Sequence, residues 1–283
     1  MSELWDLYTM YREKTGLDMV RGNPIPDGYL HLSVHVWMRN GEGKYLISQR
    51  SATRPNFPLK WESVAGAVLK GETSFEAALR EVKEEIGIDL CPEDGKKCFT
   101  NIRLKVDGRV FNRAADVYLF RYDGEANLEN APTDEVAQCR WMSREEILAL
   151  IDAGEFVETQ RYFRGAFESP EPDYRDIIGT KVRCVIDRPL GSRHPRKPAI
   201  VYRVNYGYVP GVTGGDGAEQ DVYVIGVNEP LDEFEGTVIG VYYRYDDVEN
   251  KWIVAPDGMN FTDDRILGDI AFVEQFFFGK LYR

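Results

Sequence analysis

The sequence predicts an α+β protein made of two successive parts. In residues 29–151, strands of mixed direction alternate with two helices, which is typical of a sheet covered by helices on both sides. After residue 178 the strands are short, with a turn at Val209-Pro210-Gly211, and a single terminal helix over 262–278 follows them, which favours a small β-barrel of OB-like form. Residues 168–176 are acidic and proline-rich, as in a linker. We therefore predict a first domain over 1–165, a linker over 166–177 and a second domain over 178–283.

Length and composition agree with two globular domains and limit the expected partners. The 283 residues carry a formal net charge of −12, which argues against binding to nucleic-acid backbones or anionic membranes. The first residues have neither the basic region nor the apolar run of a signal peptide. The 4 cysteines are scattered without a Cys-x-x-Cys motif, so we expect reduced thiols and a cytoplasmic protein. With only 3 histidines, zinc is disfavoured and carboxylate chemistry is expected.

The first predicted elements are a short amphipathic helix over 3–14 and a hairpin of two strands. Residues 29–38 alternate as a strand does, which places His31 and His35 on one face. Two interpretations of these histidines are open, contact with a substrate and partial burial in the strand, and we favour partial burial. Residues 40–43 form the turn, and residues 44–51 are the returning strand, in which Arg50 either holds a phosphate or lies on the surface.

The next stretch, residues 66–88, is mostly a helix by local rules. Thr73 and Glu76 form a capping box, and Gly87 is the expected C-terminal stop. Three acids project as neighbours from one helix face because they are spaced at i, i+3 and i+4: Glu81, Glu84 and Glu85. Like charges at that spacing repel, so the cluster is stable only when water dilutes it or a cation neutralises it. Hard divalent ions such as Mg²⁺ take oxygen ligands of this kind.

This stretch resembles the Nudix box, Gly-x5-Glu-x7-Arg-Glu-aliphatic-x-Glu-Glu-x-Gly-aliphatic, and matches it at every fixed position. The resemblance implies an α/β/α sandwich and a hydrolase that splits a small-molecule diphosphate with Mg²⁺ or Mn²⁺. It also implies a backbone carbonyl from the loop at Gly66 as a metal ligand. The catalytic set that it implies consists of Glu72, Arg80, Glu81, Glu84 and Glu85, of which the last three bind the metal and Arg80 orients Glu81 or Glu72. The general base is either Glu85 or a downstream acid such as Glu135.

Residues around the box supply candidate substrate contacts. Trp61 precedes the strand that enters the box, and residues 100–106 and 110–121 are strands around an Asp107-Gly108 turn. Basic residues in this hairpin, Arg103 among them, either clamp a phosphate or protect a solvated edge strand. The candidate substrate-binding set is therefore Arg50, Trp61 and Arg103. Residues 135–142 read as a further strand and 143–151 as a helix with a second capping box, formed by Ser143 and Glu146.

The first half also resembles the Nudix subgroup related to isopentenyl diphosphate isomerase. The resemblance rests on Trp5-Asp6, Thr15-Gly16, Arg21-Gly22 and the runs VHVWMRN and QRS. That isomerase needs a catalytic cysteine just before the box, where this chain has Trp61-Glu62-Ser63-Val64-Ala65. Hydrolysis is therefore favoured, and isomerisation remains as the alternative.

The second half resembles a shortened soluble family I inorganic pyrophosphatase. The resemblance rests on the run NYGYVP (205–210) and on Asp216-Gly217 and Asp221-Val222. It implies a second metal site formed by Asp187, Asp216, Asp221 and Glu249. Ala218 replaces the family's middle aspartate, and the Tyr-Lys pair of its terminal helix is reduced to Lys280. Two roles remain open with equal weight: an active inorganic pyrophosphatase, or a barrel that stabilises, forms a homodimer or binds a phosphorylated ligand without turnover.

Overall fold

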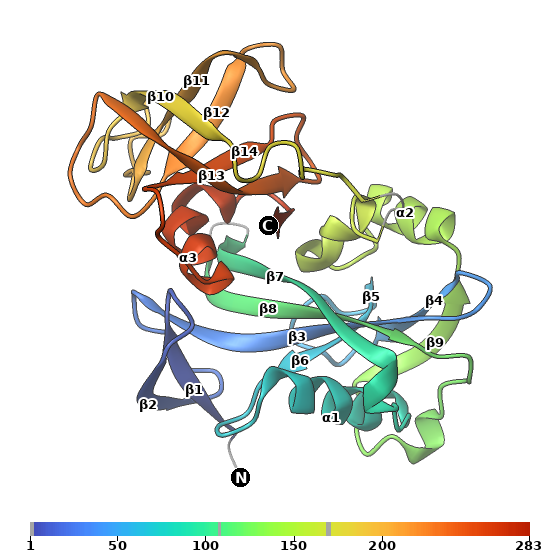
Figure 1. Cartoon of the computed structure of the whole chain (residues 1–283). Coiled ribbons are helices and arrows are strands. Elements are labelled where there is room, and N and C mark those ends of the chain that lie inside the picture. The colour runs from blue at the N-terminus through green and yellow to red at the C-terminus, as the bar shows by residue number, and fades with distance from the viewer. Residues whose placement is uncertain (1–2, 107–108, 168–170) are drawn as a thin grey trace. The chain divides into compact units, whose positions relative to one another are not determined.

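The computed structural model describes residues 3–106, 109–167 and 171–283, which form two compact units (Figure 1). Unit 1 comprises Met1–Thr9 and Lys14–Arg164, and unit 2 comprises Met10–Glu13 and Gly165–Arg283. The predicted linker lies within unit 2, and its residues 168–170 lie outside the described residues, as does the predicted Asp107-Gly108 turn. None of the helices in the described part of the chain is long and apolar enough to cross a membrane.

Unit 1 contains a nine-stranded sheet of mixed direction around β3 (Tyr29–Arg39). β3 pairs in parallel with β8 (Arg109–Arg121) and antiparallel with β6 (Val64–Ala67) and, at its end, with β4 (Tyr45–Arg50). The remaining strands are β1 (Leu4–Thr9), β2 (Lys14–Val20), β5 (Trp61–Glu62), β7 (Gly95–Val106) and β9 (Val136–Met142). The mixed sheet with few helices agrees with the α/β fold that the sequence predicts for this half.

Two α-helices and three short 3-10 helices accompany this sheet in the described part of unit 1. α1 (Ser74–Ile86) packs against β3 and β6, below the sheet in Figure 1. α2 (Arg144–Asp152) begins at the predicted capping box of Ser143 and Glu146. The 3-10 helices are η1 (Pro92–Asp94), η2 (Leu128–Asn130) and η3 (Glu158–Arg164). Alternation along β3 buries apolar side chains on one face and places His31, Ser33 and His35 on the other.

The helix predicted over residues 3–14 is wrong. Those residues enter the hairpin of β1 and β2, in which Leu4 pairs with Val20 and Asp6 with Asp18. β1 also extends the large sheet, since Tyr8 pairs with Leu30 of β3. Tertiary pairing thus overrides a short helical periodicity, as expected for a segment with many aromatic and branched residues.

Unit 2 contains a six-stranded sheet and one α-helix among its described residues. The strand order is β10 (Lys181–Arg188), β11 (Asn205–Thr213), β12 (Glu219–Val224), β14 (Lys251–Ala255), β13 (Glu233–Arg244) and β15 (Gly279–Tyr282). β10 pairs with both β11 and β13, and β12 runs parallel to β14. The core is aliphatic and includes Val222, Val224, Val238, Val241 and Val254. The OB-like barrel stays a prediction.

Two boundaries in unit 2 differ from the sequence-based expectation. The predicted turn at Val209-Pro210-Gly211 lies inside β11, where the pairing with β12 shifts register between Val209 and Thr213. Proline and glycine are accommodated there because a bulge removes the need for regular pairing. The predicted helix over 262–278 is shorter: α3 spans Asp263–Glu274, and β15 follows it.

Candidate active site

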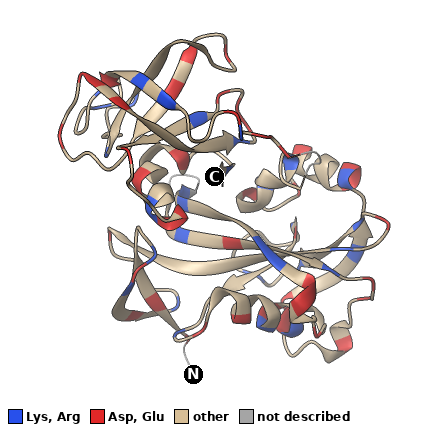
Figure 2. Cartoon of the chain, viewed as in Figure 1, with Lys and Arg blue, Asp and Glu red and all other residues tan. Residues whose placement is uncertain are grey.

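Helix α1 presents the predicted carboxylates from a well-capped scaffold. The Thr73 hydroxyl accepts a hydrogen bond from the Glu76 N–H, and the Glu76 carboxylate accepts one from the Thr73 N–H. Gly87 ends the helix in the left-handed conformation, at φ 70°. One face is buried through Ala77, Ala78, Val82 and Ile86. Figure 2 shows acidic and basic residues side by side along the helix, which is where the site lies.

Arg80 gathers the box carboxylates around one guanidinium group. Its Nε and Nη2 donate to the two carboxylate oxygens of Glu72, at 2.8 and 3.0 Å. Its Nη1 donates to Glu81 and to Glu84, both at 2.9 Å, and Nη2 also donates to the backbone carbonyl of Ala67. A planar fork with five N–H donors can hold three carboxylates and a carbonyl at once, which an ammonium group cannot do.

Gly66 lets the Glu81 carboxylate lie directly against the backbone of β6. A Cβ atom at position 66 would lie 1.8 Å from Glu81 Cδ and 2.0 Å from its Oε1. Any side chain there would displace the carboxylate. The glycine of the box is therefore required by close approach, and the carboxylate of Glu81 and the backbone of the Gly66 loop meet in space.

Glu85 is the most deeply buried acid of the set, and it lies near a partner that sequence reasoning missed. Glu85 and Glu62 are both about 4% exposed. Burial, and then the charges of Glu62, Glu81 and Glu135, raise the pKa of Glu85 well above its usual value. Glu62 is ion-paired with Arg50, yet burial raises its pKa as well. The only sequence signal for Glu62 was an acid inside an otherwise apolar strand leading into the box.

The donor set fits a hard divalent cation. Within the described ranges no three carboxylates are arranged closely enough to share one ion, because Arg80 holds Glu81 and Glu84. Carboxylate oxygens are nevertheless the ligands that Mg²⁺ and Mn²⁺ take. Burial, and then the neighbouring Glu84 and Glu135, raise the pKa of Glu81 to about 7. A bound cation would reverse this effect and favour the ionised carboxylates of Glu81 and Glu85.

The other predicted residues of unit 1 lie at different places. Arg50 donates to Glu62 and to the carbonyl of Asn56, so it faces the box acids. Glu135 is ion-paired with Arg54 and contributes charge at Glu81 and Glu85, which keeps it as a candidate base.

Two candidate substrate contacts, Trp61 and Arg103, prove to be buried. Trp61 is 7% exposed and forms a β-bridge with Phe156, which leaves its ring little surface for a substrate. Arg103 is 6% exposed and pairs with Arg113 across β7 and β8. Neither therefore lies on the solvated surface: Arg103 is on β7, which pairs only with β8 among the described strands, but its side chain is covered.

Three of the four acids predicted for unit 2 interact with Lys251, and the fourth, Asp187, lies near one of them. The ammonium of Lys251 is 2% exposed and forms ion pairs with Asp221 and Glu249. Asp216 accepts a hydrogen bond from the Ala218 N–H and interacts with the Glu249 side chain. Burial, and then the charge of Asp221, raise the pKa of Asp187, so these two carboxylates lie near each other. The fold thus brings together residues that are more than 60 positions apart.

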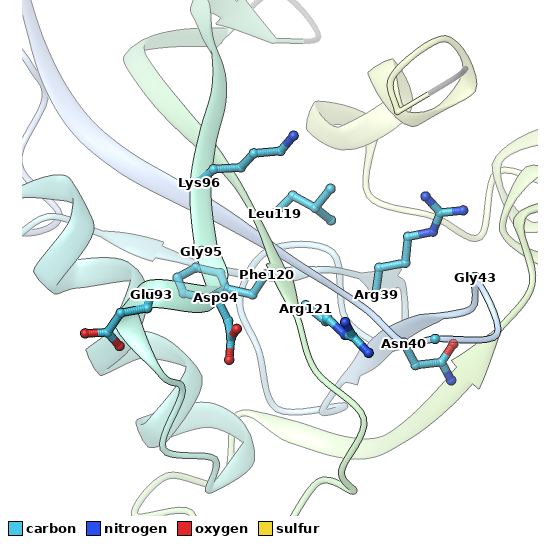
Figure 3. Close-up of a pocket in the computed structure, with 11 residues that line it drawn as sticks. Arg39, Asn40, Gly43, Glu93, Asp94, Gly95, Lys96, Leu119, Phe120 and Arg121 are labelled. Carbon is cyan, nitrogen blue, oxygen red and sulfur yellow. The ribbon is translucent and has the colours of Figure 1, made fainter. Parts of the chain in front are cut away.

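A pocket of about 420 Å³ lies at the far end of β3, away from the box acids (Figure 3). Its walls carry both basic and acidic side chains: Arg39, Lys96, Arg121, Glu93 and Asp94. None of the predicted site residues lines it. Because Arg39 is five residues along β3 from Val34, which pairs with Gly66, this pocket is roughly 17 Å along the strand from the box loop.

Comparisons with known proteins agree on the class of the first half. The NUDIX domain family model matches residues 29–163. An uncharacterised Nudix hydrolase of Listeria innocua is 39% identical over 158 residues, which is 55% of this chain and 88% of the relative. The isopentenyl-diphosphate Delta-isomerase of Escherichia coli is 28% identical over 45% of this chain and 69% of its own length. A crystal structure of a Deinococcus radiodurans protein has a TM-score of 0.48 and 26% identity, and covers 59% of this chain and 100% of that one.

Proposed function

The chain belongs to the Nudix hydrolase family, and from this premise we propose that the site on α1 hydrolyses the diphosphate bond of a nucleoside diphosphate-linked or similar compound. The observation that carries the proposal is the burial of Glu81 and Glu85 beside Glu62, with a surplus of acid that raises their pKa values. A binding module would have no need of such a costly arrangement.

Each residue of the site has a definite task in this reaction. Glu81, Glu84 and Glu85 would hold Mg²⁺ or Mn²⁺, together with the carbonyl of Gly66. When bound, the metal neutralises the diphosphate and activates water for attack at phosphorus. Arg80 keeps Glu72 and Glu81 in place through the hydrogen bonds described above. Either Glu85 or Glu135 takes the proton of the attacking water.

A screen over diphosphate compounds tests this proposal on the full chain, with an added phosphatase that converts the two monophosphate products into measurable orthophosphate. We expect turnover of at least one compound with Mg²⁺ or Mn²⁺, and loss of that turnover when a chelator is added. Failure of every compound in the presence of either metal contradicts the proposal.

An isomerase-like enzyme is the alternative, supported by the similarity to the E. coli isomerase. Residues 61–66 contain no cysteine, and the cysteine that is electrostatically linked to the box is Cys139 of β9. Burial, and then Glu85, raise the pKa of its thiol to about 12, which keeps it protonated and unreactive. An assay for double-bond migration in isopentenyl diphosphate separates the two functions.

For unit 2 we propose a phosphate-compound site on an OB-like barrel similar to the inorganic pyrophosphatases. The convergence of Asp187, Asp216, Asp221 and Glu249 near Lys251 supports it. A Nudix reaction that releases pyrophosphate would then supply the substrate or ligand of this second site. Titration of the full chain with Mg²⁺-pyrophosphate, compared with Asp221→Asn, tests the assignment. Equal affinities would leave a regulatory or structural barrel as the role of unit 2.

A further inference from the structure

A row of three basic or ionisable side chains crosses the sheet of unit 1 on the face of β3 that carries His31, Ser33 and His35. The register pairs His31 of β3 with Arg113 of β8, and Arg113 with Arg103 of β7. Paired residues on adjacent strands point to the same face, so Arg113 lies between His31 and Arg103. Such a row places positive charge in the middle of a sheet, where it must be compensated.

Arg113 has no carboxylate partner of its own. Among the described residues no acid forms an ion pair with it, although it is only partly exposed. The carboxylate whose charge most favours its ionised form is Glu62, and Glu62 is already paired with Arg50. One flat face of the guanidinium is covered by Phe111, with Cζ 4.3 Å from the ring centroid. Among the residues that the structure describes, its guanidinium forms one hydrogen bond, from Nη2, so Nε and Nη1 have no partner there.

The guanidinium is held in place by a chain of neutral groups. Nη2 of Arg113 donates to Nε2 of His35 at 3.4 Å, so the proton of His35 is on Nδ1, which donates to the Tyr162 hydroxyl at 3.0 Å. The indole N–H of Trp37 donates to the same hydroxyl at 2.9 Å. Burial, and then Arg113, hold the pKa of His35 well below its usual value, so the imidazole is neutral. This arrangement orients Arg113 without neutralising it.

The same face also carries buried polar atoms whose hydrogen-bonding capacity is not satisfied by the described residues. Within the described part of the chain, Nδ1 of His31 and Oγ of Ser33 are buried and form no hydrogen bond. Ser33 pairs with Ala115 on one side and with Ala67 on the other, so only small side chains flank it within the sheet. A buried polar group without a partner costs free energy unless a ligand or water satisfies it.

We infer that Arg113 binds a phosphate group of the substrate, with His31 and Ser33 as additional hydrogen-bonding groups and His35 and Tyr162 as positioning residues. The inference rests on the proposed function and names Arg113 as a residue that determines which substrates bind. The unused edge of a guanidinium fits two oxygens of one phosphate. Recognition here is independent of the metal, because the positive charge comes from the chain itself.

Phosphate titration followed by NMR tests the binding step separately from catalysis. Inorganic phosphate is added to the full chain in the presence of a chelator, and the ring nitrogens of His35 are observed. We expect saturable shifts of the His35 signals in the wild type, and at least about tenfold weaker binding in Arg113→Gln. Arg121→Gln, an exposed arginine on the same strand, is the matched control and should bind as the wild type does. Absence of shifts in the wild type, or equal shifts in Arg113→Gln, overturns the inference.

Steady-state kinetics on the best substrate of the screen complete the test. Arg113→Gln should raise KM at least about tenfold with kcat largely retained. Should Arg113→Gln fail to fold, Arg113→Lys decides the matter: it keeps the charge but lacks the fork, and a several-fold higher KM is expected. An unchanged KM in the folded variant refutes the role of Arg113. Absence of turnover in the wild type would instead refute the proposed function, because the phosphate titration does not depend on it.

Discussion

The two acidic clusters of this chain differ in how their negative charge is compensated. In unit 1, Arg80 binds Glu72, Glu81 and Glu84 but leaves Glu85 and its neighbours with raised pKa values. In unit 2, the more deeply buried Lys251 pairs with both Asp221 and Glu249. Unit 1 thus has a surplus of acid that only an added cation removes, whereas unit 2 compensates much of its charge internally. Dependence on a metal should therefore be stronger in unit 1.

The largest expected effect is on turnover, and it follows from removing one negative charge from the acidic cluster of unit 1. Glu84→Gln keeps the shape of the side chain and should lower turnover about a hundredfold or more, because a metal ligand is lost while the fold is retained. Glu76→Gln on the same helix is the control, since Glu76 bonds only to Thr73. Phosphate release with Mg²⁺ measures both variants. Wild-type turnover in Glu84→Gln would remove the distinction between the two clusters.

A second test concerns the close approach of backbone and carboxylate that only unit 1 shows. Gly66→Ala places a methyl group on the Glu81 carboxyl and should lower kcat by about tenfold, with little change in secondary structure. Gly214→Ala in unit 2 meets neighbours only at 3.5 Å and beyond, so its kcat should not change. If Gly66→Ala retains full activity, the position of Glu81 against the backbone has no bearing on the reaction.

Lys251→Met tests the internal compensation of unit 2. The substitution leaves Asp221 and Glu249 without their cation, and we expect a loss of about 2 kcal/mol in the free energy of unfolding, less than for a fully buried pair because both acids are partly exposed. Adding Asp221→Asn should restore part of that loss. Denaturant unfolding followed by circular dichroism gives both values, and additive effects of the two changes would show that the charges are not coupled.

Local chemistry explains which parts of the molecule were predictable. α1 was predicted nearly to the residue because Thr73, Glu76 and Gly87 define its ends within the helix itself. The β1 and β2 hairpin was not, because residues 3–14 carry a helical periodicity that pairing with β2 and β3 overrides. The role of Glu62 beside Glu85, and the burial of Trp61, depend on packing that no spacing encodes.

Unit 2 shows the same limit of prediction from the sequence. The acids Asp216, Asp221 and Glu249 could be named from a family resemblance. Their compensation by a nearly inaccessible Lys251 could not, since burial is a property of the folded sheet.

The smallest expected effect is on the pH dependence of stability, and it distinguishes a histidine of unit 1 from a histidine of unit 2. His31 of unit 1 stacks on Trp5, and burial, followed by Arg113, lowers its pKa from 6.5 to about 3. The unfolded chain therefore binds a proton that the folded chain does not, so stability falls as the pH drops below about 6.5 and continues to fall until about pH 3. At pH 6 this loss amounts to about 1 kcal/mol relative to pH 8.

His31→Phe keeps the aromatic contact and removes the titration, so unfolding of this variant should depend less on pH between 8 and 5. His194→Gln in unit 2 is the control, because His194 is only partly buried, whereas His31 is buried. Thermal unfolding of the wild type and the two variants at pH 8 and at pH 5 measures how strongly the stability of each depends on pH. Parallel pH profiles for the wild type and His31→Phe would show that His31 is not held neutral in the fold.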